Sequence, residues 1–544
     1  MKKFLLYISA ITTIIASLAV NEATAAERPR LLVNIVVSGM RTDDLVRYNK
    51  NFSNGGFNRL INNGAYFTNA SYDYMQTTTP VGLATLSTGA MPSTHGVVSD
   101  SWFDYVGNKR VSLIEDSKEQ CVNYSGDAIG YSPRQLIAET ISDAMIQSDS
   151  TSQVATIAIE PLSAIVTAGH SGEVYWMETL QTAWTTSSYY TKELPAWITQ
   201  YNQTDKNLDF LTKRWNALLE YDNYLNSRVA CIEGLKSKQN KRIDHIEEDA
   251  AEIKKIFSDE YAQMCYTPTG NSALLAFAKQ MVANNKMGGD EVPDILNIVL
   301  DTPRKICSRF GPESVEYEDM LYRLDRDLEE FISFVTAQVT DPQQIVVTLC
   351  SDHGTSPSFD IESNHVERFN VRQAEVITNA FIGAQHGNGE WVLGYIDRAI
   401  YLNHDLIYER KLTVAAIQAE ATTFVQQFRG VANAVSATDL QRTTFTKGAQ
   451  HLMQNSFYPR RSGDIVLWLT PQRIEEQSGK MADSGSPYNY DRHVPLIIYG
   501  GGIAAHHSAR RVCVTSLAPT LASLLGISRP DCADAEPLTE IKHK

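Results

Sequence analysis

The sequence predicts an α/β fold in which helices cover both faces of a mostly parallel central sheet. Three short runs, at 31–37, 294–300 and 345–349, are rich in β-branched and aliphatic residues and carry few polar side chains. Strands that are buried on both faces have this composition, whereas half-exposed strands alternate polar with apolar residues. Helical patterns lie between the runs, and this alternation indicates parallel strands.

Other elements follow the same rhythm. Further strands are predicted at 154–159, 464–469 and 494–499. Helices are predicted from Ser132-Pro133 onward, between Met320 and Val335, and from Leu517 to Leu525, where Gly526 ends the last one.

A chain of 544 residues is long enough for one large domain with insertions. We expect a single domain over 26–544, with a core formed by about 26–177, 291–355 and 462–544. The segments 178–290 and 356–461 interrupt the strand and helix pattern, and we interpret both as cap insertions. The first is expected to be mostly helical.

The N-terminus has the parts of a secretory signal peptide. Two lysines precede an apolar stretch from Phe4 to Val20, and Ala23-Thr24-Ala25 supplies small residues for cleavage. We predict a signal peptide over 1–25, cleavage after Ala25, and a periplasmic or secreted protein. The alternative is an uncleaved N-terminal anchor. No later run is long and apolar enough to predict a membrane span.

Charge and cysteine content restrict the partners and the redox chemistry. The formal net charge is −15, which argues against nucleic acid as a partner. Seven cysteines include no CxxC pair and no zinc-finger spacing. Export would permit disulfides, and the nearest pairs outside the predicted strands are Cys513–Cys532 and Cys231–Cys265.

The stretch from Thr77 to Gly82 is the first candidate for a functional site. Thr79 precedes Pro80 and an apolar run, which predicts a helix with Thr79 at its N-cap. A hydroxyl there lies near free backbone N–H groups and the positive end of the helix dipole, which attract a phosphate. The alternative is that Thr79 is only a helix cap.

Polar residues also follow the predicted strands. Ser38 follows the first strand, and Asp352-His353 follow the strand at 345–349, where α/β sheets bind ligands. A carboxylate next to an imidazole is a partial site for zinc or manganese. His493, directly before another strand, is a further candidate ligand.

These residues, together with the segments 88–97 and 518–526, resemble the alkaline phosphatase superfamily. The likeness is closest to bacterial phosphate-irrepressible alkaline phosphatases and their phosphodiesterase/nucleotide pyrophosphatase relatives, and it covers nearly the whole mature chain. It implies a three-layer α/β/α sandwich and a two-zinc site where a threonine attacks phosphorus. Thr79 matches the nucleophile, and Asp352, His353 and His493 match three metal ligands.

Other positions depart from that family pattern. Ser38, Arg304 and Ser308 stand where the resemblance implies an aspartate, an aspartate and a histidine, so three of six metal ligands are replaced. Losing two carboxylates and gaining a guanidinium should expel at least one dication. We therefore expect at most one zinc ion, or none.

Positions that would face the phosphate have changed as well. Asp100 stands in place of a family asparagine, and Glu160 and Leu162 stand at a Lys-x-Arg phosphate clamp. Asp301 could substitute as a ligand, although a turn or cap role is favoured, and Arg304 could hold an anion instead of zinc.

Two functions are consistent with this sequence. The favoured one is an impaired or inactive pseudo-phosphatase that binds a small phosphate ester, another anion or a protein partner. The alternative is an active single-metal phosphomonoesterase or phosphodiesterase, or a related ester hydrolase, that uses Thr79 as its nucleophile.

Overall fold

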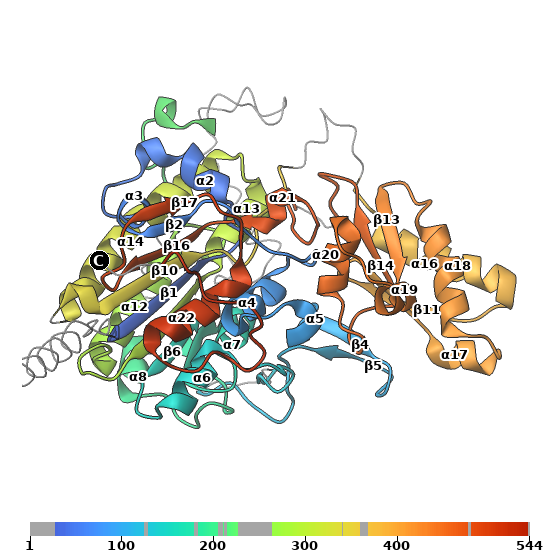
Figure 1. The fold of residues 1–544 in the computed structure, drawn as a ribbon, viewed down its shortest axis with the longest axis horizontal. Helices are drawn as coiled ribbons and strands as arrows, with labels where there is room; N and C mark the ends of the chain where they lie inside the picture. The colour runs from blue at the N-terminus through green and yellow to red at the C-terminus, as the bar shows by residue number, and fades with distance from the viewer. Residues whose placement is uncertain are drawn as a thin grey trace, which may run out of the picture.

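The computed structural model describes residues 28–123, 129–178, 183–204, 210, 215–226, 264–339, 341–358, 368–476 and 480–541. Within these residues a nine-stranded sheet forms the centre of the molecule (Figure 1). Its strands lie in the order β17 (His506–Ser508), β2 (Ala65–Phe67), β16 (Leu496–Gly500), β10 (Ile345–Cys350), β1 (Leu31–Val37), β9 (Asp294–Leu300), β6 (Val154–Ala158), β7 (Glu173–Glu178) and β8 (Ala183–Thr185).

The middle of this sheet is parallel, as predicted. β1 pairs in parallel with β10 on one side and with β9 on the other. β6 continues the parallel arrangement between β9 and β7. β16 and β8 run antiparallel to their neighbours β10 and β7. The predicted bounds of the strands at 31–37 and 294–300 are those of β1 and β9.

Helices cover both faces of the sheet, which confirms the three-layer sandwich. Leu31, Val33 and Ile35 of β1 pack in one core with α12 (Thr269–Asn285) and α14 (Val315–Gln338). Leu32 and Val36 point to the other face and belong to a second core. The helices of that second core are α4 (Thr79–Thr88), α7 (Pro161–Ala168) and α22 (Leu517–Leu525).

The second insertion has its own sheet and its own core. The strand order is β11 (Val392–Ile396), β12 (Ala399–Leu402), β14 (Ile465–Leu469) and β13 (Val431–Ser436). The predicted strand at 464–469 falls in the segment 462–544, which we expect in the core. In the structure it is β14 of the smaller sheet, paired between β12 and β13. A buried apolar strand has the same composition in either sheet, so its sequence could not place it.

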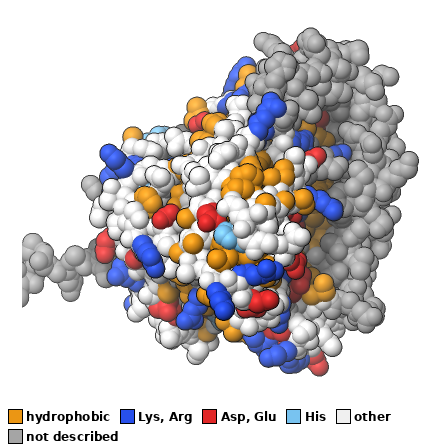
Figure 2. Space-filling model, turned by 90° about the vertical axis from the view of Figure 1, so that its right-hand side faces the viewer, with side chains coloured by type: hydrophobic (Ala, Val, Ile, Leu, Met, Phe, Trp, Pro, Cys, Tyr) orange, Lys and Arg blue, Asp and Glu red, His pale blue; other side chains and the backbone are white. Residues whose placement is uncertain are grey.

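Helices α16 (Val371–His386) and α18 (Val414–Val425) pack on this smaller sheet at the right of Figure 1. Figure 2 shows that side of the molecule, where basic and acidic side chains intermix. The hairpin of β4 (Ser101–Asp104) and β5 (Lys109–Ser112) joins the insertion to the core. The Tyr105 ring that follows β4 stacks on His404 with centroids 4.0 Å apart.

Part of the first predicted insertion belongs to the core. β8 extends the main sheet, and α12 packs against α14 and the central strands. Residues 227–263 lie outside the described residues, so the predicted helical cap is tested only at its ends.

Two helix starts differ from the prediction. Thr78 is the N-cap of α4 and Thr79 is its first helical residue, and neither side chain makes a capping hydrogen bond. The helix predicted from Ser132-Pro133 begins later, as α6 (Ile141–Ser148), because Thr140 and Asp143 form a capping box at its start.

The cysteine predictions have different outcomes. Cys513 and Cys532, one of the two candidate disulfide pairs, are free thiols in the structure and form no bond there. Cys231 lies outside the described residues, as does the predicted signal peptide. In the described part of the chain, no helix is long and apolar enough to cross a membrane.

Gly82 sets the distance between α4 and the end of β10, and its replacement is the first test of this packing. An alanine Cβ at 82 would lie 1.8 Å from the Asp352 carbonyl oxygen. We predict that Gly82→Ala lowers the free energy of unfolding by about 3 kcal/mol, as overpacking does. Urea denaturation measures this change.

Gly383→Ala is the matched control, because Gly383 lies inside α16 and a Cβ there would meet nothing closer than 3.7 Å. It should stabilise the protein by about 1 kcal/mol, since alanine favours helix over glycine. Equal effects of the two substitutions would contradict the packing described here.

Candidate active site

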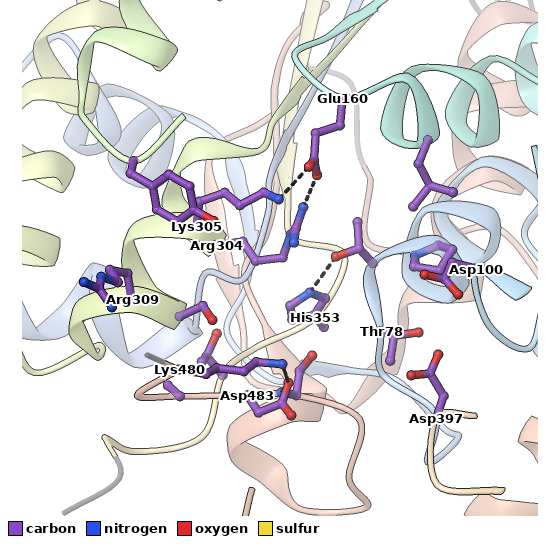
Figure 3. A pocket seen from close by; sticks show the side chains of 18 of the residues that line it. Thr78, Asp100, Glu160, Arg304, Lys305, Arg309, His353, Asp397, Lys480 and Asp483 are labelled. Carbon is purple, nitrogen blue, oxygen red and sulfur yellow. Dashed lines mark hydrogen bonds and ion pairs between the residues drawn. The ribbon is translucent and has the colours of Figure 1, made fainter. Parts of the chain in front are cut away.

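A cavity of about 650 Å³ opens where the parallel strands end, the edge at which α/β sheets bind ligands. Thr79, Asp100 and His353, three of the predicted site residues, line it (Figure 3). Arg304 and Ser308 also line it, from α13 (Thr302–Phe310). The cavity is therefore at the position that the sequence predicts.

Thr79 and His353 are hydrogen-bonded to each other. The Thr79 Oγ1 to His353 Nε2 distance is 3.1 Å, and His353 Nδ1 lies 2.6 Å from the Gly354 carbonyl oxygen. A carbonyl only accepts, so Nδ1 carries the proton of the neutral ring and Nε2 accepts from the Thr79 hydroxyl. The hydroxyl is thus held by an imidazole.

Asp352 uses both carboxylate oxygens inside the protein. Oδ1 accepts from the backbone N–H groups of Gly39 at 3.0 Å and His353 at 2.9 Å. Oδ2 accepts from the Ser38 hydroxyl at 2.7 Å. Asp352 is fully buried and does not line the cavity. It fixes the strand ends of β1 and β10 instead of facing a ligand.

The guanidinium of Arg304 completes this arrangement. Its Nε donates to Ser38 Oγ at 3.2 Å, so Ser38 bridges Arg304 and Asp352. Burial opposes the charge of Arg304, but Glu160, Asp301 and Asp352 outweigh it and raise the pKa of the guanidinium. A permanent cation is therefore fixed beside Asp352.

Glu160 is the main partner of the cations at this wall. It forms ion pairs with Arg304 and, at 2.5 Å, with Lys305. Burial alone would raise the pKa of Glu160, but the charges of Lys305 and Arg304 prevail and lower it to about 2. Glu160 therefore offsets one of the two positive charges that Arg304 and Lys305 bring to this wall.

Asp301 has the capping role that its sequence position favoured. Its Oδ2 accepts from the backbone N–H groups of Ile159 and Glu160, at 3.1 and 3.0 Å. Its Oδ1 accepts from Ser163 Oγ in the first turn of α7. Asp301 therefore holds the start of α7 and places Glu160 at the cavity.

His493 does not belong to this site, contrary to the prediction. It lies in β15 (His493–Val494), which pairs with β3 (Ala70–Ser71), and its Nε2 lies 2.9 Å from the Thr68 carbonyl oxygen. The residues of this chain segment that do line the cavity are Lys480, Ala482, Asp483 and Ser484. Proximity to a strand in sequence did not show on which side of the sheet the imidazole lies.

The donors present do not fit the predicted metal site. Within the part of the chain that the structure describes, no three His, Cys, Asp or Glu side chains are arranged to hold a metal ion. Asp352 is bonded to Ser38 and backbone amides, His353 is bonded to Thr79, and His493 lies elsewhere. A dication would have to break these bonds beside the Arg304 charge.

Sequence reasoning missed several cavity residues. Lys305 adjoins Arg304 on α13, and Asp397 lies at the tip of the β11–β12 hairpin. The dipeptide Asp397-Arg398 lacks the glycine that usually marks a two-residue hairpin turn, so the sequence gives no clear signal for this turn. Lys480, Asp483 and Ser484 lie in an irregular segment, whose sequence carries no clear signal either.

The lowered pKa of Glu160 predicts a dependence of stability on pH. A carboxyl whose pKa falls from 4.5 to about 2 on folding stabilises the protein above pH 4.5 and loses this effect as the pH falls toward 2. The side chain is 28% exposed, so we expect on the order of 2 kcal/mol.

Urea denaturation of the wild type and Glu160→Gln across this pH range measures the effect. The stability difference between them should be constant above pH 5 and shrink as the pH falls. A difference that grows toward low pH would contradict the charge pairing.

Comparison with known proteins shows to which family this fold belongs. Alkaline phosphatase PafA from Elizabethkingia meningoseptica is 28% identical over 548 residues, covering 99% of each chain. Alkaline phosphatase PhoV from Synechococcus elongatus is 26% identical and covers 94% of this chain and 93% of its own. The crystal structure of wild-type PafA superimposes with a TM-score of 0.86 and covers 95% of this chain and 99% of that one.

A family model described as type I phosphodiesterase/nucleotide pyrophosphatase matches residues 32–484. Because that match spans most of the chain, the protein belongs to this family of the alkaline phosphatase superfamily.

Proposed function

We propose that this protein is a pseudo-phosphatase, which has lost two-metal hydrolysis of phosphate esters and keeps the cavity as a binding site for a small ligand. The observation that carries the proposal is the chain Arg304–Ser38–Asp352. In this chain of hydrogen bonds, the Arg304 guanidinium stands where the family resemblance implies a metal ligand. Ser38 links the guanidinium to Asp352, which the resemblance also implies as a metal ligand.

Electrostatics makes this replacement incompatible with a two-metal site. A guanidinium cannot lose its proton in a protein and offers no lone pair to a metal. A unit charge and a dication at about 4 Å repel each other by about 8 kcal/mol at an effective dielectric constant of about 20. Ser38 and Ser308 supply no negative charge to offset this repulsion.

The cavity also has no excess of positive charge for a phosphate dianion, because four acidic side chains, Asp100, Glu160, Asp397 and Asp483, line it together with four basic ones, Arg304, Lys305, Arg309 and Lys480. Glu160 pairs with both Arg304 and Lys305, and Asp483 pairs with Lys480 at 2.6 Å. Asp100 adds a further carboxylate to the wall beside Thr79. In this proposal the cavity still binds a ligand but does not hydrolyse phosphate esters.

A second candidate function is an ester hydrolase that uses Thr79 as its nucleophile, with at most one zinc ion. The observation in its favour is the hydrogen bond from the Thr79 hydroxyl to His353 Nε2. The existing hydrogen bonds argue against this function. To bind zinc, His353 would have to release Thr79, and Asp352 would have to release Ser38.

The compartment is part of the same proposal. The N-terminal residues 1–25 carry the pattern of a cleavable signal, so we propose a periplasmic or secreted protein. A protein partner remains a proposal as well.

Metal analysis and kinetics test the main proposal. Purified protein should contain substoichiometric zinc after incubation with zinc and gel filtration. Aryl phosphate mono- and diesters should show no turnover that Thr79→Ala abolishes. Two equivalents of zinc with rapid, Thr79-dependent turnover would contradict the proposal.

Restoring the family's ligands tests whether their replacement is what prevents metal binding. We predict that Ser38→Asp, Arg304→Asp, Ser308→His and Ser484→His together restore zinc binding, because Ser484 lines the cavity. The triple variant without Ser484→His should bind zinc more weakly. Calorimetric titration with zinc measures both.

His493→Ala in the fourfold variant is the control, and it should leave zinc affinity unchanged, since His493 bonds the Thr68 carbonyl. No gain of zinc affinity in the fourfold variant would show that factors other than these four side chains exclude the metal. A loss of affinity with His493→Ala would contradict its placement.

A further inference from the structure

Helix α4 carries two threonines that each contact a histidine, and the two pairs differ in where the proton lies. In the cavity, His353 Nε2 accepts from the Thr79 hydroxyl at 3.1 Å, because Nδ1 carries the ring proton (Figure 3). In the other pair, His95 Nε2 lies 3.0 Å from Thr85 Oγ1, and His95 Nδ1 accepts from the Val97 amide at 3.1 Å. Burial lowers the pKa of His95 to about 3, so this ring is neutral and its Nε2 carries the proton. Of the two imidazoles, that of His353 is the one able to take a proton from its threonine.

The surroundings of His353 suit it to the role of a base. Asp352 Oδ2 lies 3.6 Å from His353 Nε2, and the 2.6 Å contact of Nδ1 with the Gly354 carbonyl holds the ring in place. When Nε2 takes the Thr79 proton, the imidazolium gains the nearby carboxylate. A hydroxyl, a base and a group that orients the base are the parts of an activated serine or threonine nucleophile. This activation needs no metal ion.

The first turn of α4 offers backbone N–H groups to a developing negative charge. No side chain caps this helix, Pro80 has no N–H, and the Gly82 N–H is bonded to the Thr78 carbonyl at 2.9 Å. The amides of Thr79 and Val81 have no hydrogen-bond partner within the described part of the chain. Backbone N–H groups at the nucleophile stabilise the oxyanion of acyl transfer in this way.

The lining of the cavity favours an uncharged substrate over a phosphate ester. Leu162 stands where the family resemblance implies a cationic residue of the phosphate clamp, and Pro80 and Pro161 add apolar surface. Asp100 and Asp397 would repel a phosphate dianion, but they do not repel an uncharged ester. The volume of about 650 Å³ accommodates a small organic molecule.

We propose that Thr79 and His353 hydrolyse small, uncharged carboxylic esters without a metal ion. The inference rests on the proposed function, because it requires that no zinc ion be bound to His353, and it names the substrate class of the same site. Thr79 Oγ1 attacks the carbonyl carbon, and its proton passes to His353 Nε2, which gives it to the departing alcohol as the C–O bond breaks. Water, deprotonated by His353, then releases the acid from the acyl-threonine, and the proton returns to Thr79.

Hydrolysis of p-nitrophenyl acetate by the full-length protein in EDTA tests this inference. We expect turnover above the rate in buffer alone. Because p-nitrophenolate leaves readily, acetylated Thr79 should accumulate, and mass spectrometry after an acid quench should find it. No turnover in EDTA, or an acetyl group on another residue in place of Thr79, would overturn the inference.

Substitutions assign the turnover to this pair. Thr79→Val removes the hydroxyl at nearly constant shape and should abolish turnover, whereas Thr79→Ser should keep it measurable. His353→Gln should lower kcat about a hundredfold or more, as the loss of a general base does. Thermal denaturation would confirm that the variants fold.

Thr85→Val is the matched control, because it removes the hydroxyl of the other pair on the same helix, and Thr85 does not line the cavity. It should retain the wild-type turnover. Wild-type turnover in Thr79→Val or His353→Gln, or equal losses in Thr79→Val and Thr85→Val, would contradict the inference.

The outcome is distinct from that of the proposed function. Zinc-dependent turnover of aryl phosphates would refute the pseudo-phosphatase proposal, whereas the turnover of the carboxylic ester is measured with zinc removed. Absence of that ester turnover would refute the role of Thr79 and His353 and leave the pseudo-phosphatase proposal standing.

Discussion

The hydrogen bonds from Arg304 to Ser38 and from Ser38 to Asp352 determine the character of the whole site. They connect α13, the helix that follows β9, to the ends of β1 and β10, at the edge where α/β sheets bind ligands. Without a metal ion, a buried carboxylate at this place needs another source of positive charge. The guanidinium supplies it, and the two backbone amides complete the shell of Asp352.

The fold of the family is retained, whereas the proposed pseudo-phosphatase function rests on the side chains that line the cavity. The chain keeps the three layers of the fold, and α4 brings the Thr79 hydroxyl within hydrogen-bond distance of His353. Glu160 has become the partner of two cations instead of a contributor to a phosphate clamp. Asp397, brought in by the second insertion, then makes the opposite wall acidic. Ion pairs line one side of the cavity, and on the other side Asp100 and Asp397 form no ion pair with any of the described residues.

Much of the fold could be predicted because it depends on local composition. The apolar runs of β1 and β9 gave the strand bounds, and Gly526 marked the end of α22. The sequence could not place β14, since an apolar strand fits either sheet. It also gave α6 a start too early, because the capping pair Thr140 and Asp143 outweighs the preference of proline for a first helical turn.

The sequence predicts those site residues that follow a strand or begin a helix, but it does not predict those that lie in loops. Thr79, Asp352 and His353 were found because strand ends and helix starts meet at one edge. His493 was misplaced since sequence alone does not show which way a residue beside a strand faces. Asp397 and Ser484 reach the cavity only through the tertiary arrangement of the second insertion and the segment after it.

The position of the Arg304 side chain is the central claim, and a crystal soaked in zinc tests it directly. Anomalous diffraction at the zinc edge should give no peak between Ser38, Asp352 and Ser484, and the electron density there should show the guanidinium bonded to Ser38. A strong anomalous peak beside Asp352 and His353, with Arg304 displaced, would contradict the account.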